Sequence, residues 1–519
     1  MTRQVPDDGG QPDVGCLRRL SNKLSEISLC FILPFRSDHY IDITIVSFVY
    51  LYLIVSFGLV LGVTSYARRS KIIQDRSKMP MLDIYCLGCM VISCAMMLTN
   101  FFRKRVPNFV QFIKFPRRYY RPFVVALYFF GTVSLVFDVL TIVVTVTCAY
   151  AHILSWIYTF IKMLFTLLTI IFINKFATAS FNESLTAKLS LIHVIATYFC
   201  ILIRIPLSNS RPRIPESHWF TNVACDRIFT NPTKHGGGPY IISYDSEFIL
   251  TAMVFTLMIW LNMENCDASR PSSSSTSMQP QIYALEEYHL QGEYPSTPRE
   301  PNIDVGLIVG LTFGAILSLP YTFMWQNTIM TDKQLELFVY HLGFVGLMLS
   351  ASALALVKIS KNQMAFLSGI NFPCTLMIFF LFFFCCCYAA FSILAATSEL
   401  IVRKHDQLSS LMFANEVATF IESITQTFLI AKFYICFPSS TSKNHGNVVK
   451  QCSLFLMVCN LVQWIHMVYF DLSHRDKTEL QEAFYGRHIW RTISKTTYPF
   501  CMYYRLFSTF CLFEISFMF

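Results

Sequence analysis

The sequence predicts an all-α polytopic membrane protein with about 12 transmembrane helices. Of its 519 residues, 54% are apolar and only 14% are charged, a composition well outside that of soluble domains. The 49 Phe and 25 Tyr support this class, because large apolar side chains can face lipid without a loss of solubility. The third observation is a repetition of apolar runs of about 20 residues, the length that a helix needs to cross the hydrocarbon core.

The apolar runs fall into two equal groups along the chain. The first six are residues 41–64, 81–101, 122–145, 153–175, 185–205 and 243–261. The second six are residues 305–325, 335–358, 372–396, 408–437, 449–469 and 489–517. These runs predict an N-terminal six-helix half over residues 41–261 and a C-terminal six-helix half over residues 305–519.

Two polar segments lie outside the predicted halves. Residues 262–304 contain a Ser- and Pro-rich stretch that cannot bury a core, so we expect a flexible linker there. Residues 1–40 lack the short apolar core of a cleavable signal peptide and are expected to form an N-terminal tail. An even number of spans places both termini on one side, and the basic clusters between spans favour the cytosol for the termini and the linker.

Several functional classes receive no support from the sequence. The net charge of +9 is scattered at the ends of apolar runs rather than on a basic helix, so no nucleic-acid partner is expected. No phosphate-binding Gly loop or nucleophile motif is evident, and we expect no enzyme. The CxxC pair of Cys86 and Cys89 has no second pair to complete a zinc site. We therefore expect no cofactor and no metal.

Ionisable residues inside the predicted spans are the candidates for function. A charge at the bilayer centre costs on the order of 3 kcal/mol, so such residues usually face the bundle or a water-filled path. The main ones are Asp138, Lys162, His193, Arg204, Glu247, His341, Glu416, Glu422, His466, Arg505 and Glu514. A distribution of one or two ionisable residues per helix suits a proton relay better than it suits metal ligation. A lone His or Glu is as often a structural group, which leaves channel, transporter and receptor open.

A family pattern is concentrated near the C-terminus and recurs in order through both halves. Residues 456–465 and 498–515 resemble the last two helices of otopetrins, and residues 130–138, 191–204, 244–248 and 426–430 resemble otopetrin spans three, five, six and ten. The resemblance covers the membrane region, whereas the N-terminal tail and the linker are unmatched. It implies a twelve-helix, proton-selective channel of the plasma membrane that conducts H+ into the cell, opens with external acid and forms a homodimer.

The resemblance also implies candidate residues for proton permeation or gating. His193 and Glu247 match the family's span-five histidine and span-six glutamate, and Asp138 matches the span-three acid. Histidine has an ordinary pKa near 6.5, so it can respond to modest acidification. The full candidate set is His193, Glu247, Asp138, Glu416, Glu422, Gln426, Tyr504, Arg505 and Glu514.

Four positions depart from the otopetrin pattern. Thr169 and Glu422 stand where the family has Gln, Phe248 stands where many members have Tyr, and Lys162 is an added charge in span four. Lys162 and Glu422 are candidate partners for one another, and Arg505 and Glu514 are expected to pair in the last helix. These changes keep two alternatives open, a secondary transporter and a non-conducting otopetrin-like membrane protein.

Overall fold

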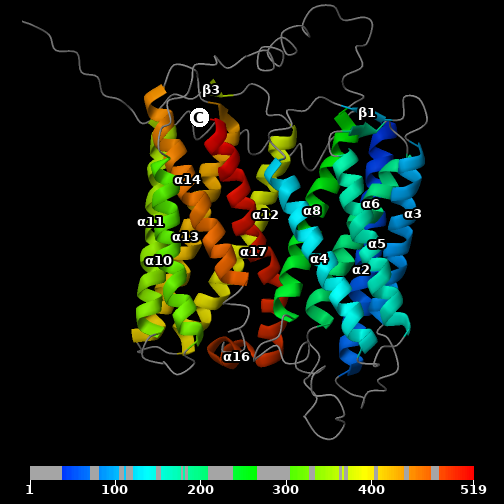
Figure 1. The fold of residues 1–519 in the computed structure, drawn as a ribbon, viewed down its shortest axis with the longest axis horizontal. Helices are drawn as coiled ribbons and strands as arrows, with labels where there is room; N and C mark the ends of the chain where they lie inside the picture. The colour runs from blue at the N-terminus through cyan, green and yellow to red at the C-terminus, as the bar shows by residue number, and fades with distance from the viewer. Residues whose placement is uncertain are drawn as a thin grey trace, which may run out of the picture.

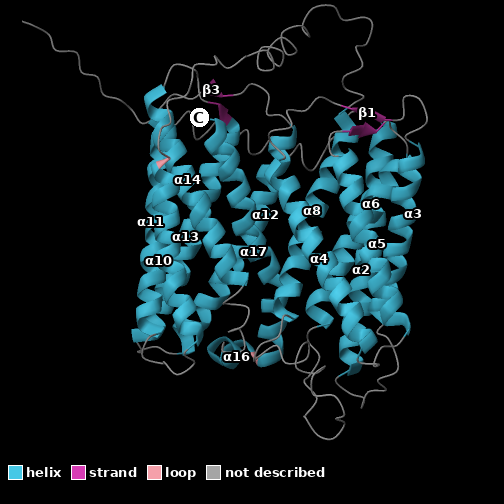
Figure 2. Cartoon of the chain, in the orientation of Figure 1, coloured by secondary structure: helices cyan, strands magenta, loops and turns pink. Residues whose placement is uncertain are grey.

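The chain folds into long, nearly parallel or antiparallel helices that stand side by side (Figures 1 and 2). The computed structural model describes residues 38–69, 81–103, 110–112, 121–147, 153–176, 179–181, 185–208, 238–265, 304–326, 334–361, 365–366, 372–402, 407–437, 443–468 and 479–518. Apart from four strands of two or three residues, the described chain is helical. The predicted fold class, an all-α polytopic membrane protein, is confirmed. Most of the predicted tail and linker lies outside the described residues.

The first helix set comprises the helices that precede the predicted linker. These are α2 (Asp38–Arg69), α3 (Met81–Arg103), α4 (Arg121–Thr147), α5 (Ile153–Phe176), α6 (Leu185–Ser208) and α8 (Gly238–Asn265). Helix α2 packs on α6 and α3, while α4 packs on α5 and α8. The loops at one end of the set meet through an antiparallel pair of strands, β1 (Val110–Phe112) and β2 (Ala179–Phe181).

The second helix set comprises the helices that follow. These are α10 (Val305–Gln326), α11 (Gln334–Lys361), α12 (Phe372–Val402), α13 (Gln407–Ile435), α14 (Lys443–His466), the short α16 (Glu479–Tyr485) and α17 (Arg487–Met518). Helix α13 packs between α11 and α12, and α14 packs on α10 and α17. Strands β3 (Ala365–Phe366) and β4 (Cys436–Phe437) pair at the end of the set opposite α16.

Nine helices within the described residues are long and apolar enough to cross a membrane: α2, α3, α4, α5, α6, α8, α11, α12 and α14. In α10 the apolar part among the described side chains is limited to Val305–Ile316. Helices α13 and α17 are as long as their neighbours but carry more polar residues, including Glu422 and Arg505, which are fully buried. Their polar side chains therefore face other helices, because a charge in a low-dielectric environment is costly unless it is paired.

The two helix sets contact each other through α17, which touches α4, α6 and α8, and through α12, which touches α8. Trp464 of α14 also reaches α4 and α8. Aromatic rings fill this contact. Phe123 lies 5.2 Å from Phe507, and Phe130 lies 5.7 Å from Trp464, both measured between ring centroids in edge-on arrangements. Such pairs contribute about 0.5–1.5 kcal/mol each beyond the area that they bury. The buried core is continuous across this contact.

Helix α10 approaches α14 closely because glycines face it. A Cβ atom added at Gly306 would overlap the backbone carbonyl of Gln451, and the Gly306 N–H donates to Gln451 Oε1 at 2.6 Å. Gly310 and Gly314 continue the same face at four-residue spacing. Small residues at this spacing allow helix backbones to approach one another in membranes.

We expect Gly306→Ala to destabilise the protein by about 1–3 kcal/mol, because the added methyl group overpacks a backbone contact. The measurement is the apparent unfolding temperature of the detergent-purified protein. Gly343→Ala is the control, because a Cβ at Gly343 of α11 meets no atom within 4 Å. Equal unfolding temperatures for the two variants would contradict the close α10–α14 contact.

Candidate functional site

Glu247 lies where the two helix sets meet. It is fully buried on α8, and its Oε1 accepts a hydrogen bond from Trp464 Nε1 of α14 at 3.2 Å. Its Oε2 has no hydrogen-bond partner among the described residues. One turn further along α8, Thr251 Oγ1 accepts from the Tyr503 hydroxyl of α17 at 3.1 Å. Two helices of the second set thus hold the turn of the first set that carries this carboxyl.

His193 is buried among α2, α3 and α6. Its Nε2 lies 3.3 Å from the Cys89 carbonyl oxygen, and its Nδ1 lies 3.0 Å from the Tyr50 hydroxyl. Because a carbonyl only accepts, this geometry assigns the ring proton to Nε2 and makes Nδ1 the acceptor from Tyr50. A second proton on the ring would require Tyr50 to turn and accept. Among the described residues the hydrogen-bond partners of His193 come from α2 and α3, whereas that of Glu247 comes from α14, so the two candidates share no partner.

Asp138 belongs to an ion-paired cluster inside the first helix set. Lys162 Nζ lies 2.8 Å from Asp138 Oδ1 and 2.6 Å from Asp245 Oδ2. Ser134 Oγ donates to the other oxygen of Asp245 at 2.6 Å. The suggested pairing of Lys162 with Glu422 is therefore wrong, because α5 presents Lys162 to acids on α4 and α8. The added charge in span four is compensated locally.

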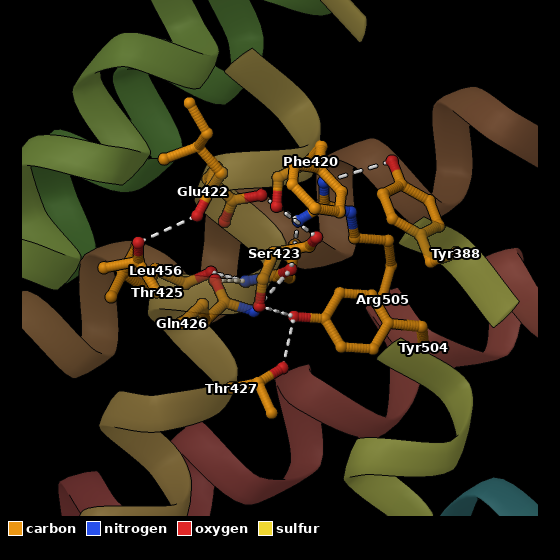
Figure 3. A network of polar contacts seen from close by, with 12 residues as sticks. Tyr388, Phe420, Glu422, Ser423, Thr425, Gln426, Thr427, Leu456, Tyr504 and Arg505 are labelled. Atoms are coloured by element: carbon orange, nitrogen blue, oxygen red, sulfur yellow. Dashed lines mark hydrogen bonds and ion pairs between the residues drawn. The ribbon is translucent and has the colours of Figure 1, made fainter. Parts of the chain in front are cut away.

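Arg505 and Glu422 form the centre of a polar network in the second helix set (Figure 3). Arg505 Nη1 lies 2.7 Å from Glu422 Oε2 and donates to Asn460 Oδ1 at 3.2 Å, while Nη2 donates to the Tyr388 hydroxyl at 3.1 Å. The expected pairing of Arg505 with Glu514 is wrong. Glu514 lies nine residues further along the same helix, about 13 Å along the axis, whereas Glu422 faces Arg505 from α13.

The same network continues through amide and hydroxyl groups. Gln426 and Asn460 exchange two hydrogen bonds through their side-chain amides, at 2.8 and 3.2 Å. The Tyr504 hydroxyl donates to the Ser423 carbonyl at 2.7 Å and lies 3.1 Å from Thr427 Oγ1. The structure thus brings four of the nine candidates together, namely Glu422, Gln426, Tyr504 and Arg505.

The last two candidates lie apart from this network. Glu514 Oε2 accepts from the Tyr434 hydroxyl at 2.6 Å, near the end of α17. Glu416 lines a cavity of about 210 Å³ between α11, α12, α13, α14 and α17, which His341 and His466 also line. Within the described part of the chain, no three His, Cys, Asp or Glu side chains gather as a metal site.

Comparison with known protein families shows which family the chain resembles. The family model described as Otopetrin matches residues 221–506, more than half of the sequence. The chain belongs to the otopetrin family. The predicted family is therefore confirmed. No curated protein sequence matches the chain.

The otopetrin match covers part of the candidate set directly. Glu247, Glu416, Glu422, Gln426, Tyr504 and Arg505 lie inside the matched region, and Asp138, His193 and Glu514 lie outside it. The contact between Glu247 and Trp464, and the Arg505 network, are thus built from residues of the otopetrin region.

Four residues of these sites carry no prediction from the sequence: Asp245, Tyr388, Asn460 and Trp464. Asp245, Asn460 and Trp464 stand inside segments that resemble otopetrins, so a signal for them was present. Asn and Trp do not titrate, so a search for ionisable residues inside the spans does not select them. Nothing in the sequence around Tyr388 indicates its contact with Arg505. Among the departures, Thr169 accepts a hydrogen bond from the Tyr198 hydroxyl at 3.2 Å, inside the first helix set.

Proposed function

We propose that this otopetrin is a proton-selective channel of the plasma membrane that conducts H+ into the cell and opens with external acid. One observation carries the proposal beyond family membership. Glu247 is a fully buried carboxyl with one oxygen hydrogen-bonded to Trp464 and the other without a partner among the described residues. A carboxyl in this setting can bind and release a proton without breaking an ion pair.

The distribution of fixed charges favours the contact between the helix sets as the proton path. Lys162 lies inside the first set and Arg505 inside the second, each paired with carboxylates. A fixed cation in a narrow path opposes the entry of protons. Among the described residues, the hydrogen bond to Glu247 comes from Trp464, and no Lys or Arg forms an ion pair with Glu247. Glu514 is likewise buried and outside any described ion pair, but it lies near the end of α17. Glu247 is therefore the relay candidate that lies at the contact between the helix sets.

The proposal includes an architecture. The two helix sets correspond to six-helix halves joined by a cytosolic linker, and the protein assembles as a homodimer in the lipid bilayer. The start of α2 and the end of α17 lie at the same end of the bundle, which supports placement of both termini on one side of the membrane (Figure 1). Their assignment to the cytosol rests on the charges of the loops and on the family resemblance. The homodimer rests on the family resemblance.

The decisive experiment is whole-cell recording with an inward proton gradient, combined with imaging of intracellular pH. We expect acid-evoked inward current whose reversal potential moves by about 59 mV per unit of pH gradient, the value for a single transferred charge. A reversal potential that follows sodium or chloride would overturn proton selectivity. Surface protein without acid-evoked current would favour a transporter or a non-conducting member.

Trp464→Phe tests the contact between the helix sets. The Phe ring keeps the packing on Phe130, but Glu247 loses its donor, and an N–H donor favours the ionised carboxylate. We expect smaller acid-evoked current and a midpoint of its pH dependence that moves by about half to one pH unit, the equivalent of one hydrogen bond. Trp260→Phe on α8 is the control, because Trp260 Nε1 has no hydrogen-bond partner among the described residues. Identical pH dependence in both variants would remove Trp464 from the mechanism.

A further inference from the structure

A cavity of about 210 Å³ lies in the second helix set, apart from Glu247 and from His193. Residues of α11, α12, α13, α14 and α17 line it. It lies toward the end of the bundle that carries α16, because Phe391, which lines the cavity, stacks on Trp490 at the start of α17. In the orientation proposed above, this end faces the exterior.

The lining combines acceptor oxygens with aromatic rings. Glu416 supplies a carboxylate, and Gln463 supplies an amide oxygen that is buried and accepts no hydrogen bond from any described residue. Five rings line the same space, those of Phe338, Phe344, Tyr388, Phe391 and Tyr498. Burying an acceptor without a hydrogen bond costs about 1–3 kcal/mol, so a ligand that donates to this oxygen would be favoured.

Positive charge is largely absent from the lining. None of the described lining residues is Lys or Arg. Arg505 donates a hydrogen bond to the hydroxyl of Tyr388, which lines the cavity, but the charge of Arg505 is compensated by Glu422, with 2.7 Å between Nη1 and Oε2. The lining histidines are His341, whose Nδ1 lies 2.8 Å from Asn415 Oδ1, and His466. Glu416 is the carboxylate among the described lining residues.

We propose that this cavity is a binding site for a small organic ammonium ion. Aromatic faces attract cations through the ring quadrupole, and a desolvated site strengthens that attraction. The Glu416 carboxylate supplies the counter-charge, and Gln463 Oε1 accepts an N–H of the ligand. A free inorganic cation would use the oxygens but not the rings, and a neutral aromatic molecule would use the rings but not the carboxylate.

The test measures binding to purified protein in lipid nanodiscs at pH 8, by calorimetry and by thermal stabilisation, with benzylammonium as the probe. Because neither readout requires ion flux, the result is independent of proton conduction. We expect saturable binding with a dissociation constant in about the micromolar to millimolar range, because a ligand with few non-hydrogen atoms gains only a limited binding free energy. Benzyl alcohol, which has the same ring without the charge, is expected to bind at least about tenfold more weakly, because it forms no charge-assisted contact.

Two variants locate the site. Glu416→Gln is expected to weaken benzylammonium binding about tenfold or more, through loss of the counter-charge. Glu482→Gln is the matched control, because Glu482 pairs with Arg491 and does not line the cavity. Gln463→Leu removes the orphaned acceptor without breaking a described hydrogen bond, so it should fold and still bind several-fold more weakly.

Three results would overturn the proposal. The first is an absence of saturable benzylammonium binding to the wild-type protein, which would mean that the cavity holds water only. The second is equal affinity for benzylammonium and benzyl alcohol, which would reduce the cavity to an apolar pocket. The third is unchanged binding in Gln463→Leu together with unchanged binding in Glu416→Gln. If Glu416→Gln fails to fold, Gln463→Leu and the comparison of the two ligands still decide the matter.

Discussion

Acid-evoked proton current is expected to fall at least about tenfold in Glu247→Gln, while the amount of protein at the cell surface stays near wild type. The Gln side chain has nearly the same shape and can still accept a hydrogen bond from Trp464 Nε1. What it loses is the ability to bind and release a proton. The measurement is whole-cell current at acidic external pH, normalised to surface protein from biotinylation.

The structure explains why this substitution should spare the fold. Glu247 Oε2 has no partner among the described residues, so replacing that oxygen with NH2 breaks no described contact. Glu247→Ala is different, because it leaves the buried Trp464 N–H without an acceptor and should lower surface protein as well. Glu482→Gln serves as the control carboxylate, outside the contact between the helix sets.

Two results would contradict the role of Glu247 in proton movement. A Glu247→Gln variant that conducts like the wild type would show that the carboxyl is structural. His193→Asn is the companion variant, since it removes a titratable ring but can keep polar contacts to Tyr50 and Cys89. Unchanged current in both variants, at matched surface protein, would sink the assignment of either residue to proton movement.

Glu422→Leu is expected to destabilise the protein by about 3–5 kcal/mol and to reduce its surface amount strongly. Both members of the Glu422–Arg505 pair are fully buried, with 2.7 Å between Oε2 and Nη1. Removing Glu422 leaves a guanidinium that cannot lose its proton, and its remaining partners among the described residues are the neutral groups Asn460 and the Tyr388 hydroxyl. The measurements are surface biotinylation and the unfolding temperature of purified protein.

The reverse substitution should be milder. In Arg505→Met the remaining Glu422 carboxyl can take up a proton and become neutral, which an arginine cannot do in the opposite case. The double variant Glu422→Leu with Arg505→Met should recover much of the lost stability, because a buried ion pair can be replaced by apolar groups at little cost. A double variant as unstable as Glu422→Leu alone would show that the loss does not come from an uncompensated charge.

The positions of most helices could be predicted from the sequence. The apolar run at residues 81–101 corresponds to α3 (Met81–Arg103), and the run at 372–396 corresponds to the start and centre of α12 (Phe372–Val402). Helix length in a membrane depends on a local property, the number of successive apolar residues. Hydropathy was weaker for α13 and α17, because their polar side chains are stabilised by neighbouring helices rather than by their own composition.

Partners of the buried charges could not be predicted. The sequence suggests Glu422 as the partner of Lys162 and Glu514 as the partner of Arg505, and both pairings are wrong. Sequence shows that a helix carries a charge, but the partner depends on how far each helix is rotated and displaced against its neighbours. In α5 that rotation turns Lys162 toward Asp138 and Asp245 of the first helix set.

The class of protein, the order of its helices, its family pattern and the residues that carry charge into the membrane could all be predicted from the residues alone. Each of these depends on residue types and their local spacing. Which groups meet depends on how the helices pack. Glu247 and Trp464 are separated by 217 residues, yet their side chains form a hydrogen bond where two helix sets pack. The cavity beside Glu416 has the same origin, because its walls come from five helices whose relative placement is set by packing and not by any one segment.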